Sequence, residues 1–269
     1  FRRVLFRSKA ATAAAPVVTT DAYAGACPDP SAMPVWNPSI GDLFLPLREP
    51  VTLLGRRLAE LHLLLATRGN REAFAPEPFT TLYQRGLYQS MRNRIGAALK
   101  LLRGMREAAD PNQDADLQRL LQARFKLDEF FRNALTPKVR GSRIRTHGDM
   151  HLGQVLFTGN DFSFLDFEGD AGVPLSERRI SRSPLRDLAS LLWSLRMVAC
   201  RGKYVQETMG YRHRGQPALL DPVARAWAFT LSLPVMEGYL SVEGVDALLP
   251  EHPGEITRLT SGFMLDRAL

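Results

Sequence analysis

The sequence predicts an α+β fold that is mainly helical and contains one small β-hairpin. Before residue 135 and after residue 184, apolar residues recur at three- and four-residue steps, which is the spacing of amphipathic helices. Between these stretches, short apolar runs are separated by polar turns, as in strands. The chain of 269 residues, 45% of them hydrophobic, is long enough to bury one substantial core.

The first 49 residues are expected to precede the folded domain. Residues 1–9 read FRRVLFRSK, and their LFRS is what common sequencing-adapter DNA encodes in one frame, so we interpret this segment as non-native. A targeting peptide is the alternative, although the stretch lacks the apolar centre of a secretory signal. Residues 10–44 are rich in Ala, Pro, Thr and Asp without a sustained period. We therefore predict that residues 10–49 are a linker or loop that remains from a preceding region.

The domain is then expected to span residues 50–269 and to begin with helices. Residues 50–67 carry one apolar stripe at helical spacing. Two further helices are predicted over residues 79–106 and 115–134, because the turn signal Asp-Pro-Asn separates two apolar-periodic stretches. Together these helices predict a helical subdomain.

The middle of the chain changes to short strands. Strands are predicted over residues 143–146, 155–157 and 162–165. A Thr-Gly-Asn-Asp turn separates the last two strands, so we expect them to pair as a β-hairpin.

Helices return after the hairpin. Ser183 is a predicted N-cap, and Pro184 is suited to the first helical position, so a helix with a leucine stripe should start there. Two more helices are predicted over residues 220–239 and 254–268. Since the last of them has no stop signal before the final residue, we expect the native chain to continue past both ends.

Charge and composition exclude several classes of protein. The net charge is +7, but four positive charges lie in residues 1–9, and without them the remaining +3 is ordinary. No basic run is interleaved with aromatic residues, so we expect no nucleic-acid partner. The apolar runs are far shorter than the ~18 residues of a membrane span, so no membrane association is expected. The two cysteines form no metal or disulfide pattern, which favours a cytoplasmic location.

The chemistry is expected in two polar segments that follow predicted strands. The first reads HGDMHLGQ over residues 147–154, and the second reads DFEGD over residues 166–170. Phosphoryl transfer needs a carboxylate that orients the attacking hydroxyl, for which Asp149 is suited. In the pattern H-R-D-x-x-x-x-N the metal-binding amide lies five residues after the Asp, and Gln154 has that place here. Asp166 opens a D-F-x-G-like turn and is the predicted main Mg²⁺ ligand.

Other residues near these segments are secondary candidates. His147 and His151 are histidines of the first segment, and His147 is better suited to holding the loop by hydrogen bonding than to acting as a base. Glu168 follows the turn Asp and is a candidate for a second metal contact. Arg182 and Arg186 are candidates for phosphate or sugar contacts, although such clusters are usually solvated or ion-paired.

Two kinds of structural residue are also expected near the site. Asp187 lies in the first turn of a predicted helix, where the helix dipole favours it, and we expect it to support the loop. The aromatic residues Tyr83, Tyr88 and Trp193 are predicted to be core.

The two segments together resemble the Brenner-type motif of aminoglycoside-phosphotransferase-like kinases. The finer resemblance, over residues 36–269, is to bacterial maltokinases, which are often fused to trehalose synthase. It is carried by APEPF at 75–79, YQRGLYQS at 83–90, HGDMHLGQVL at 147–156, LDFEGD at 165–170, and ERR and RSPLRD within 177–187.

The resemblance implies a protein kinase-like fold in which residues 50–269 are the helical large lobe. It also implies ATP and Mg²⁺ as cofactors, maltose as the substrate, maltose 1-phosphate as the product, and a fused or associated trehalose synthase as a partner. Two features depart from the family. Ser181 stands where a Lys is usual, and the chain contains neither a G-x-G-x-x-G loop nor a V-A-I-K-like lysine. We therefore expect the ATP-clamping small lobe to be missing and the fragment to be inactive.

Three alternatives remain at this point. A sibling kinase that acts on another sugar, an amino alcohol or an antibiotic is the strongest. A zinc-dependent hydrolase would use His147, Asp149 and His151 as metal ligands. A kinase-like binding module without activity would be expected to lack Asp149 or Asp166, and both are present.

Overall fold

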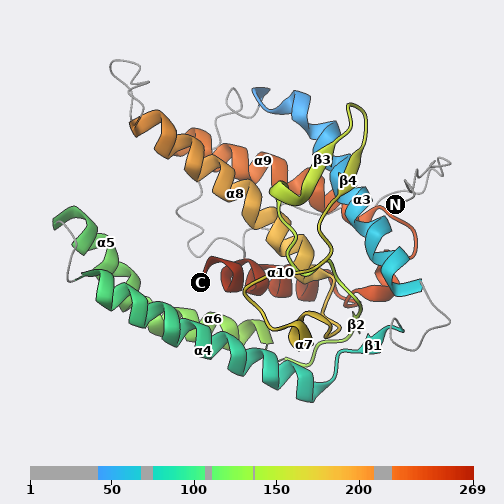
Figure 1. Cartoon of the computed structure of the whole chain (residues 1–269), viewed down its shortest axis with the longest axis horizontal. Helices are drawn as coiled ribbons and strands as arrows, with labels where there is room; N and C mark the ends of the chain where they lie inside the picture. The colour runs from blue at the N-terminus through green and yellow to red at the C-terminus, as the bar shows by residue number, and fades with distance from the viewer. Residues whose placement is uncertain (1–41, 68–74, 107–110, 136, 209–219) are drawn as a thin grey trace.

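The computed structural model describes residues 42–67, 75–106, 111–135, 137–208 and 220–269 (Figure 1). The predictions for residues 1–9 and for most of the linker 10–49 lie outside these ranges. The helices are η2 (Leu45–Leu47), α3 (Arg48–Thr67), α4 (Thr81–Arg106), α5 (Pro111–Gln122), α6 (Arg124–Leu135), η4 (Leu152–Gln154), α7 (Leu175–Arg178), α8 (Leu185–Thr208), α9 (Leu220–Leu240), η6 (Val245–Leu248) and α10 (Pro253–Ala268). The strands are β1 (Glu77–Pro78), β2 (Ser142–Arg143), β3 (Val155–Phe157) and β4 (Phe162–Phe164).

The core lies where α3, α8, α9 and α10 pack together. Helix α8 contacts both α9 and α10, and α3 lies along α9 (Figure 1). The predicted leucine stripe of α8 is fully buried against these neighbours, with Leu185, Leu188, Leu191 and Leu192 each at 0% exposure. Five predicted helices are thus confirmed, and every predicted bound agrees with the structure to within two residues. They are the helices predicted over 50–67, 79–106, 220–239 and 254–268 and the helix after Pro184.

Helices α3 and α9 cross at two glycines. A Cβ atom on Gly55 would lie 2.0 Å from the Val235 carbonyl oxygen, and a Cβ atom on Gly238 would lie 1.9 Å from the Thr52 carbonyl oxygen. Both distances are far below any real contact, so each helix rests directly on the backbone of the other. This close approach fixes α3, the helix that carries His62, against α9.

The prediction of one helix over residues 115–134 is wrong. Helix α5 ends at Gln122 and α6 begins at Arg124. The Ala123 N–H is shared between the carbonyl oxygens of Arg119 and Leu120, both at 3.1 Å, which is typical of a helix end. No Gly or Pro marks this break, so the sequence pattern does not show it. With α4, these two helices form an arm that joins the core where α6 contacts α10.

The hairpin of β3 and β4 is confirmed, with Val155 opposite Phe164 and Phe157 opposite Phe162. The strand predicted over 143–146 is shorter than expected, because β2 ends at Arg143 and Ile144 forms only an isolated bridge with Arg182. Its partner β1 was not predicted. The described chain is therefore mainly helical with two small antiparallel sheets, as the α+β prediction requires.

Three aromatic predictions have different outcomes. All three residues are partly buried, but Tyr83 and Tyr88 pack against the core, whereas Trp193 lines a groove. Within the predicted linker, Phe44 is buried and meets the Trp227 ring edge-to-face at 5.2 Å. None of the described helices is long and apolar enough to span a bilayer.

Candidate active site

Asp187 holds the start of the loop 147–154 by hydrogen bonds to its backbone. It lies in the first turn of α8 and is 2% exposed. Its carboxylate accepts the backbone N–H of His147 at 2.7 Å and that of Gly148 at 3.1 Å. Two main-chain donors on one carboxylate fix both the position and the direction of the loop.

A buried chain of polar groups continues from Asp187 into the core. The Nε2 atom of His62 lies 3.2 Å from the Asp187 carboxylate, and its Nδ1 atom lies 2.8 Å from the Tyr239 hydroxyl. Burial favours the neutral acid, but hydrogen bonding to His62, its charge and the Gly148 N–H outweigh burial and lower the pKa of Asp187. Burial also raises the pKa of Tyr239 well above its ordinary value. Asp187 is therefore an anion in the fold, and Tyr239 stays protonated.

His147 is used to hold the loop. Its Nε2 atom lies 2.7 Å from the Leu165 carbonyl oxygen, and its Nδ1 atom lies 3.4 Å from the Asp149 N–H. Its ring also packs on Phe167 at 4.9 Å. An Nε2–H donor with Nδ1 as acceptor satisfies both contacts. The side chain thus ties the first polar segment to the second.

Asp149 presents its carboxylate beside an arginine and a histidine. Its Oδ1 atom accepts a hydrogen bond from the Arg267 guanidinium at 2.7 Å, and its Oδ2 atom lies 3.7 Å from His151 Nε2. The Asp149 side chain is 22% exposed, so it remains open to a ligand. His151 Nδ1 accepts the Gly153 N–H at 3.0 Å, which orients its Nε2 toward Asp149.

Gln154 and Asp166 meet across the hairpin. The Gln154 amide Nε2 donates to the Asp166 carboxylate at 3.3 Å, and the Leu165 N–H donates to the Gln154 carbonyl at 2.9 Å. Asp166 is exposed and has a φ of 56°, a left-handed conformation that costs a non-glycine residue free energy and is common at functional turns.

The two polar segments also approach each other through glycine. Gly148 and Gly169 both have positive φ, and a Cβ atom on Gly148 would lie 3.5 Å from the Gly169 Cα. Beyond Gly169, Arg178 donates to the carbonyls of Val173 at 2.6 Å and Ala171 at 3.0 Å, which braces the second segment. Glu168 is exposed, and its side chain has no hydrogen bond or ion pair to the described residues.

Arg182 and Arg186 lie in a second cluster, centred on Asp266 of α10. Arg186 lies 3.5 Å and Arg94 3.0 Å from the Asp266 carboxylate. Burial, followed by the charge of Arg186, lowers the pKa of Arg182. Burial raises the pKa of Asp266 in spite of the arginines around it. The secondary candidates Arg182 and Arg186 are therefore brought to Asp266, while it is Arg267 that contacts Asp149.

Sequence reasoning missed His62, Tyr239, Asp266 and Arg267. None lies near the two motifs, but two of them carry a signal. His62 continues the apolar stripe of Leu54 and Leu58, and Asp266 continues that of Leu259 and Phe263. A polar residue at a core position of a helix predicts a buried hydrogen-bond or ion-pair partner.

The donor set of the site suits a hard cation. Asp166 and the Gln154 amide oxygen offer only oxygen atoms, and Mg²⁺ is usually held by one or two such ligands together with phosphates and water. Among the described residues, no three His, Cys, Asp or Glu side chains are grouped to hold a metal ion. Both nitrogens of His147 are also engaged, so the zinc-hydrolase alternative finds no support in this geometry.

Comparison with known proteins agrees with this geometry. Residues 45–228 match the phosphotransferase enzyme family. The matched range includes both polar segments and Asp187. The chain belongs to this family.

Solved structures show the same fold for this family member. A glucosamine kinase in complex with glucosamine, ADP and inorganic phosphate superposes with a TM-score of 0.61 at 21% identity, over 81% of this chain and 48% of that one. A second crystal form of glucosamine kinase gives 0.60 at 21% identity, over 81% and 46%. The chain thus spans about half the length of these structures.

Proposed function

We propose that the chain is the large helical lobe of an ATP-dependent small-molecule kinase in which Asp149 accepts the proton of the acceptor hydroxyl. The observation that carries this proposal is the position of Asp149, an accessible carboxylate on a loop that Asp187 holds through two main-chain hydrogen bonds. A fixed carboxylate beside a cation site is what phosphoryl transfer requires, because catalysis there depends on positioning and charge stabilisation.

Each residue has a defined part in this proposal. Asp149 would orient the hydroxyl and take its proton, and Arg267 and His151 lie beside its carboxylate. Asp166 and Gln154 would hold Mg²⁺, which when bound neutralises charge on the phosphates. His147 and Asp187 hold the two polar segments that carry these residues in place.

The remaining parts of the proposal concern the nucleotide and the acceptor. The chain spans about half of the solved kinase structures, and it contains no glycine-rich phosphate loop, so the ATP clamp would come from a region that precedes it. By its motifs the acceptor would be maltose, with a cytoplasmic location and trehalose synthase as a partner. The amino sugar glucosamine, named for the solved structures, is the second candidate acceptor.

The test is ATP-dependent phosphorylation by an enzyme in which the preceding coding region of the gene is joined to this chain. Turnover of maltose well above that of glucosamine is expected, and Asp149→Asn should lower kcat by about 10²–10⁴ with little change in nucleotide affinity. Asp246→Asn, an exposed acid on η6, is the matched control and should keep kcat. Full activity of Asp149→Asn would contradict the assignment, and so would the absence of transfer to any small molecule.

A further inference from the structure

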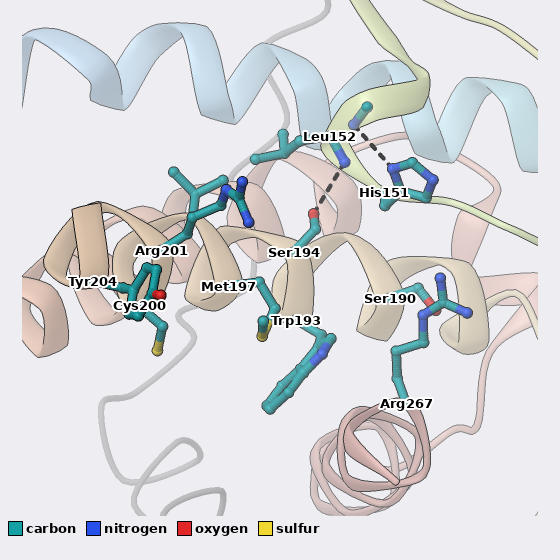
Figure 2. Close-up of a pocket in the computed structure, with 12 residues that line it drawn as sticks. His151, Leu152, Ser190, Trp193, Ser194, Met197, Cys200, Arg201, Tyr204 and Arg267 are labelled. Carbon is teal, nitrogen blue, oxygen red and sulfur yellow. Dashed lines mark hydrogen bonds between the residues drawn. The ribbon is translucent and has the colours of Figure 1, made fainter. Parts of the chain in front are cut away.

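A groove runs along the outer face of α8 and ends at the residues that contact Asp149 (Figure 2). Its volume of about 580 Å³ lies within the range usual for small-molecule sites, ~300–1,000 Å³. Arg267 and His151 line one end, and they are the two side chains next to the Asp149 carboxylate. A ligand in the groove would therefore lie next to the proposed proton acceptor.

Trp193 supplies the apolar surface of the groove. Its neighbours Leu191, Leu192 and Leu195 are buried in the core, whereas the Trp193 indole projects from α8 into the groove (Figure 2). In the part of the chain that the structure describes, its indole N–H has no hydrogen-bond acceptor. An accessible indole offers a flat apolar face and one free donor, which is the combination that binds a ring with an apolar face and a polar edge.

The opposite wall of the groove is held in place. The Leu152 N–H donates to the Ser194 hydroxyl at 3.1 Å, and this hydroxyl donates to the Leu191 carbonyl at 2.7 Å. These bonds attach η4, and with it His151 and Gly153, to α8 (Figure 2). The distance between the aromatic surface and the active-site loop is thereby fixed, which preorganises the groove for a ligand.

The charges of the groove select against a cationic ligand. Arg201 and Arg267 line it, and none of its lining residues in the described chain is Asp or Glu. Asp149 is adjacent, but Arg267 already neutralises it at 2.7 Å. A protonated amine would meet a guanidinium group at either end of the groove, Arg267 at the end next to Asp149 and Arg201 toward the other (Figure 2), and such like-charge contacts are unfavourable. Stacking of an ammonium on Trp193 would offset only a part of this repulsion.

We propose that this groove binds a neutral pyranose sugar, whose C–H face stacks on Trp193 and whose reacting hydroxyl meets Asp149, and that it rejects sugars that carry a protonated amine. The inference rests on the proposed function, because it takes Asp149 as the group that receives the hydroxyl. It selects between the two candidate acceptors in favour of the neutral sugar.

The test measures sugar binding to the 269-residue chain without ATP. The chain has three tryptophans, so Trp36→Phe with Trp227→Phe leaves Trp193 as the only one, and circular dichroism checks the fold. Saturable changes in Trp193 fluorescence are expected with maltose and with N-acetylglucosamine, and at least tenfold weaker binding with glucosamine at neutral pH. No response to any neutral sugar well above ~1 mM, the upper end of the usual KM range, would overturn the proposal. Glucosamine binding as tightly as N-acetylglucosamine would overturn it too.

A charge exchange sharpens the test. Arg201→Glu should strengthen glucosamine binding about tenfold, whereas Arg196→Glu, the same change on α8 outside the groove, should not. Equal effects of the two variants would refute selection by the groove.

In calorimetry, Trp193→Ala of the original chain should lose at least tenfold in maltose affinity, and unchanged affinity would refute the stacking role. Sugar binding at Trp193 without any phosphoryl transfer by the longer enzyme would defeat the proposed function, and with it the role of Asp149, but would leave the stacking of a neutral sugar on Trp193 intact.

Discussion

Two buried carboxylates near the active site, Asp187 and Asp266, differ in how the fold treats their charge. Asp187 has two backbone N–H donors and His62 around it, and its pKa is lowered. Asp266 has Arg94 at 3.0 Å and Arg186 at 3.5 Å, yet its pKa is raised by burial. Short, directed bonds from a fixed backbone thus stabilise a buried anion better than flexible cations that keep part of their exposure to water.

The largest effect that this comparison predicts is that of Asp187→Asn. The new amide has a single oxygen, so its NH2 group must face either the Gly148 N–H or the His147 N–H, and His62 loses its anionic partner. We expect a loss of about 3–5 kcal/mol in the free energy of unfolding, measured in urea. The exposed-site control Asp246→Asn should stay within ~0.5 kcal/mol. A loss below ~1 kcal/mol for Asp187→Asn would show that the loop does not depend on this carboxylate.

Tyr239→Phe should have the next largest effect, about 1–2 kcal/mol. The substitution keeps the ring, which is fully buried, but leaves His62 Nδ1 without its partner at 2.8 Å. In a double-mutant cycle with Asp187→Asn the two losses should not add, because both act through His62. Strict additivity would mean that the chain from Tyr239 to Asp187 is not coupled.

Asp266→Asn should cost at most ~1 kcal/mol in the same urea experiment. Burial already disfavours the Asp266 anion, and the side chain of Arg94 is 40% exposed, so water can solvate this guanidinium group when the carboxylate is gone. A loss as large as that of Asp187→Asn would contradict the contrast between the two sites.

The smallest expected effect is a difference in pH dependence. The folded-state pKa of Asp187 is below its ordinary 3.8, so its stabilisation is present above pH 3.8 and is lost as pH falls through the folded value. The folded-state pKa of Asp266 is above 3.8, so wild type should lose stability relative to Asp266→Asn as pH rises from 3.8 through the folded value. The quantity to plot against pH is the free energy of unfolding of wild type minus that of the variant. For Asp187→Asn this difference should rise with pH below 3.8, and for Asp266→Asn it should fall with pH above 3.8. Slopes of one sign would contradict the assigned shifts.

Patterns that are local in sequence predicted much of the fold. The leucine stripe of α8 and the Thr-Gly-Asn-Asp turn between β3 and β4 each depend on neighbours within a few residues, and both are observed. The break at Ala123 escaped prediction, because a shared hydrogen bond rather than a residue type ends the helix. The short β1–β2 pair escaped it as well, since two residues carry no period.

The site could be predicted only as far as its motifs reach. Residues of the two polar segments do meet, as Gln154 and Asp166 show. The partners that set their charge come from distant helices, as with Arg267 on Asp149 and His62 on Asp187. Trp193 was predicted to be core because it lies among the leucines of α8. Its outward direction depends on the way α8 packs against α9 and α10, which periodicity alone does not show.

The crossing of α3 and α9 has a consequence for how this chain can diverge. At most helix interfaces, a larger side chain on one helix is accommodated by a smaller one on the other. Gly55 and Gly238 have no such counterpart, because each faces a main-chain carbonyl that no substitution can shorten. Relatives that keep this crossing should therefore have glycine at both positions whatever surrounds them, and the pair will give no covariation signal although its helices are in direct contact.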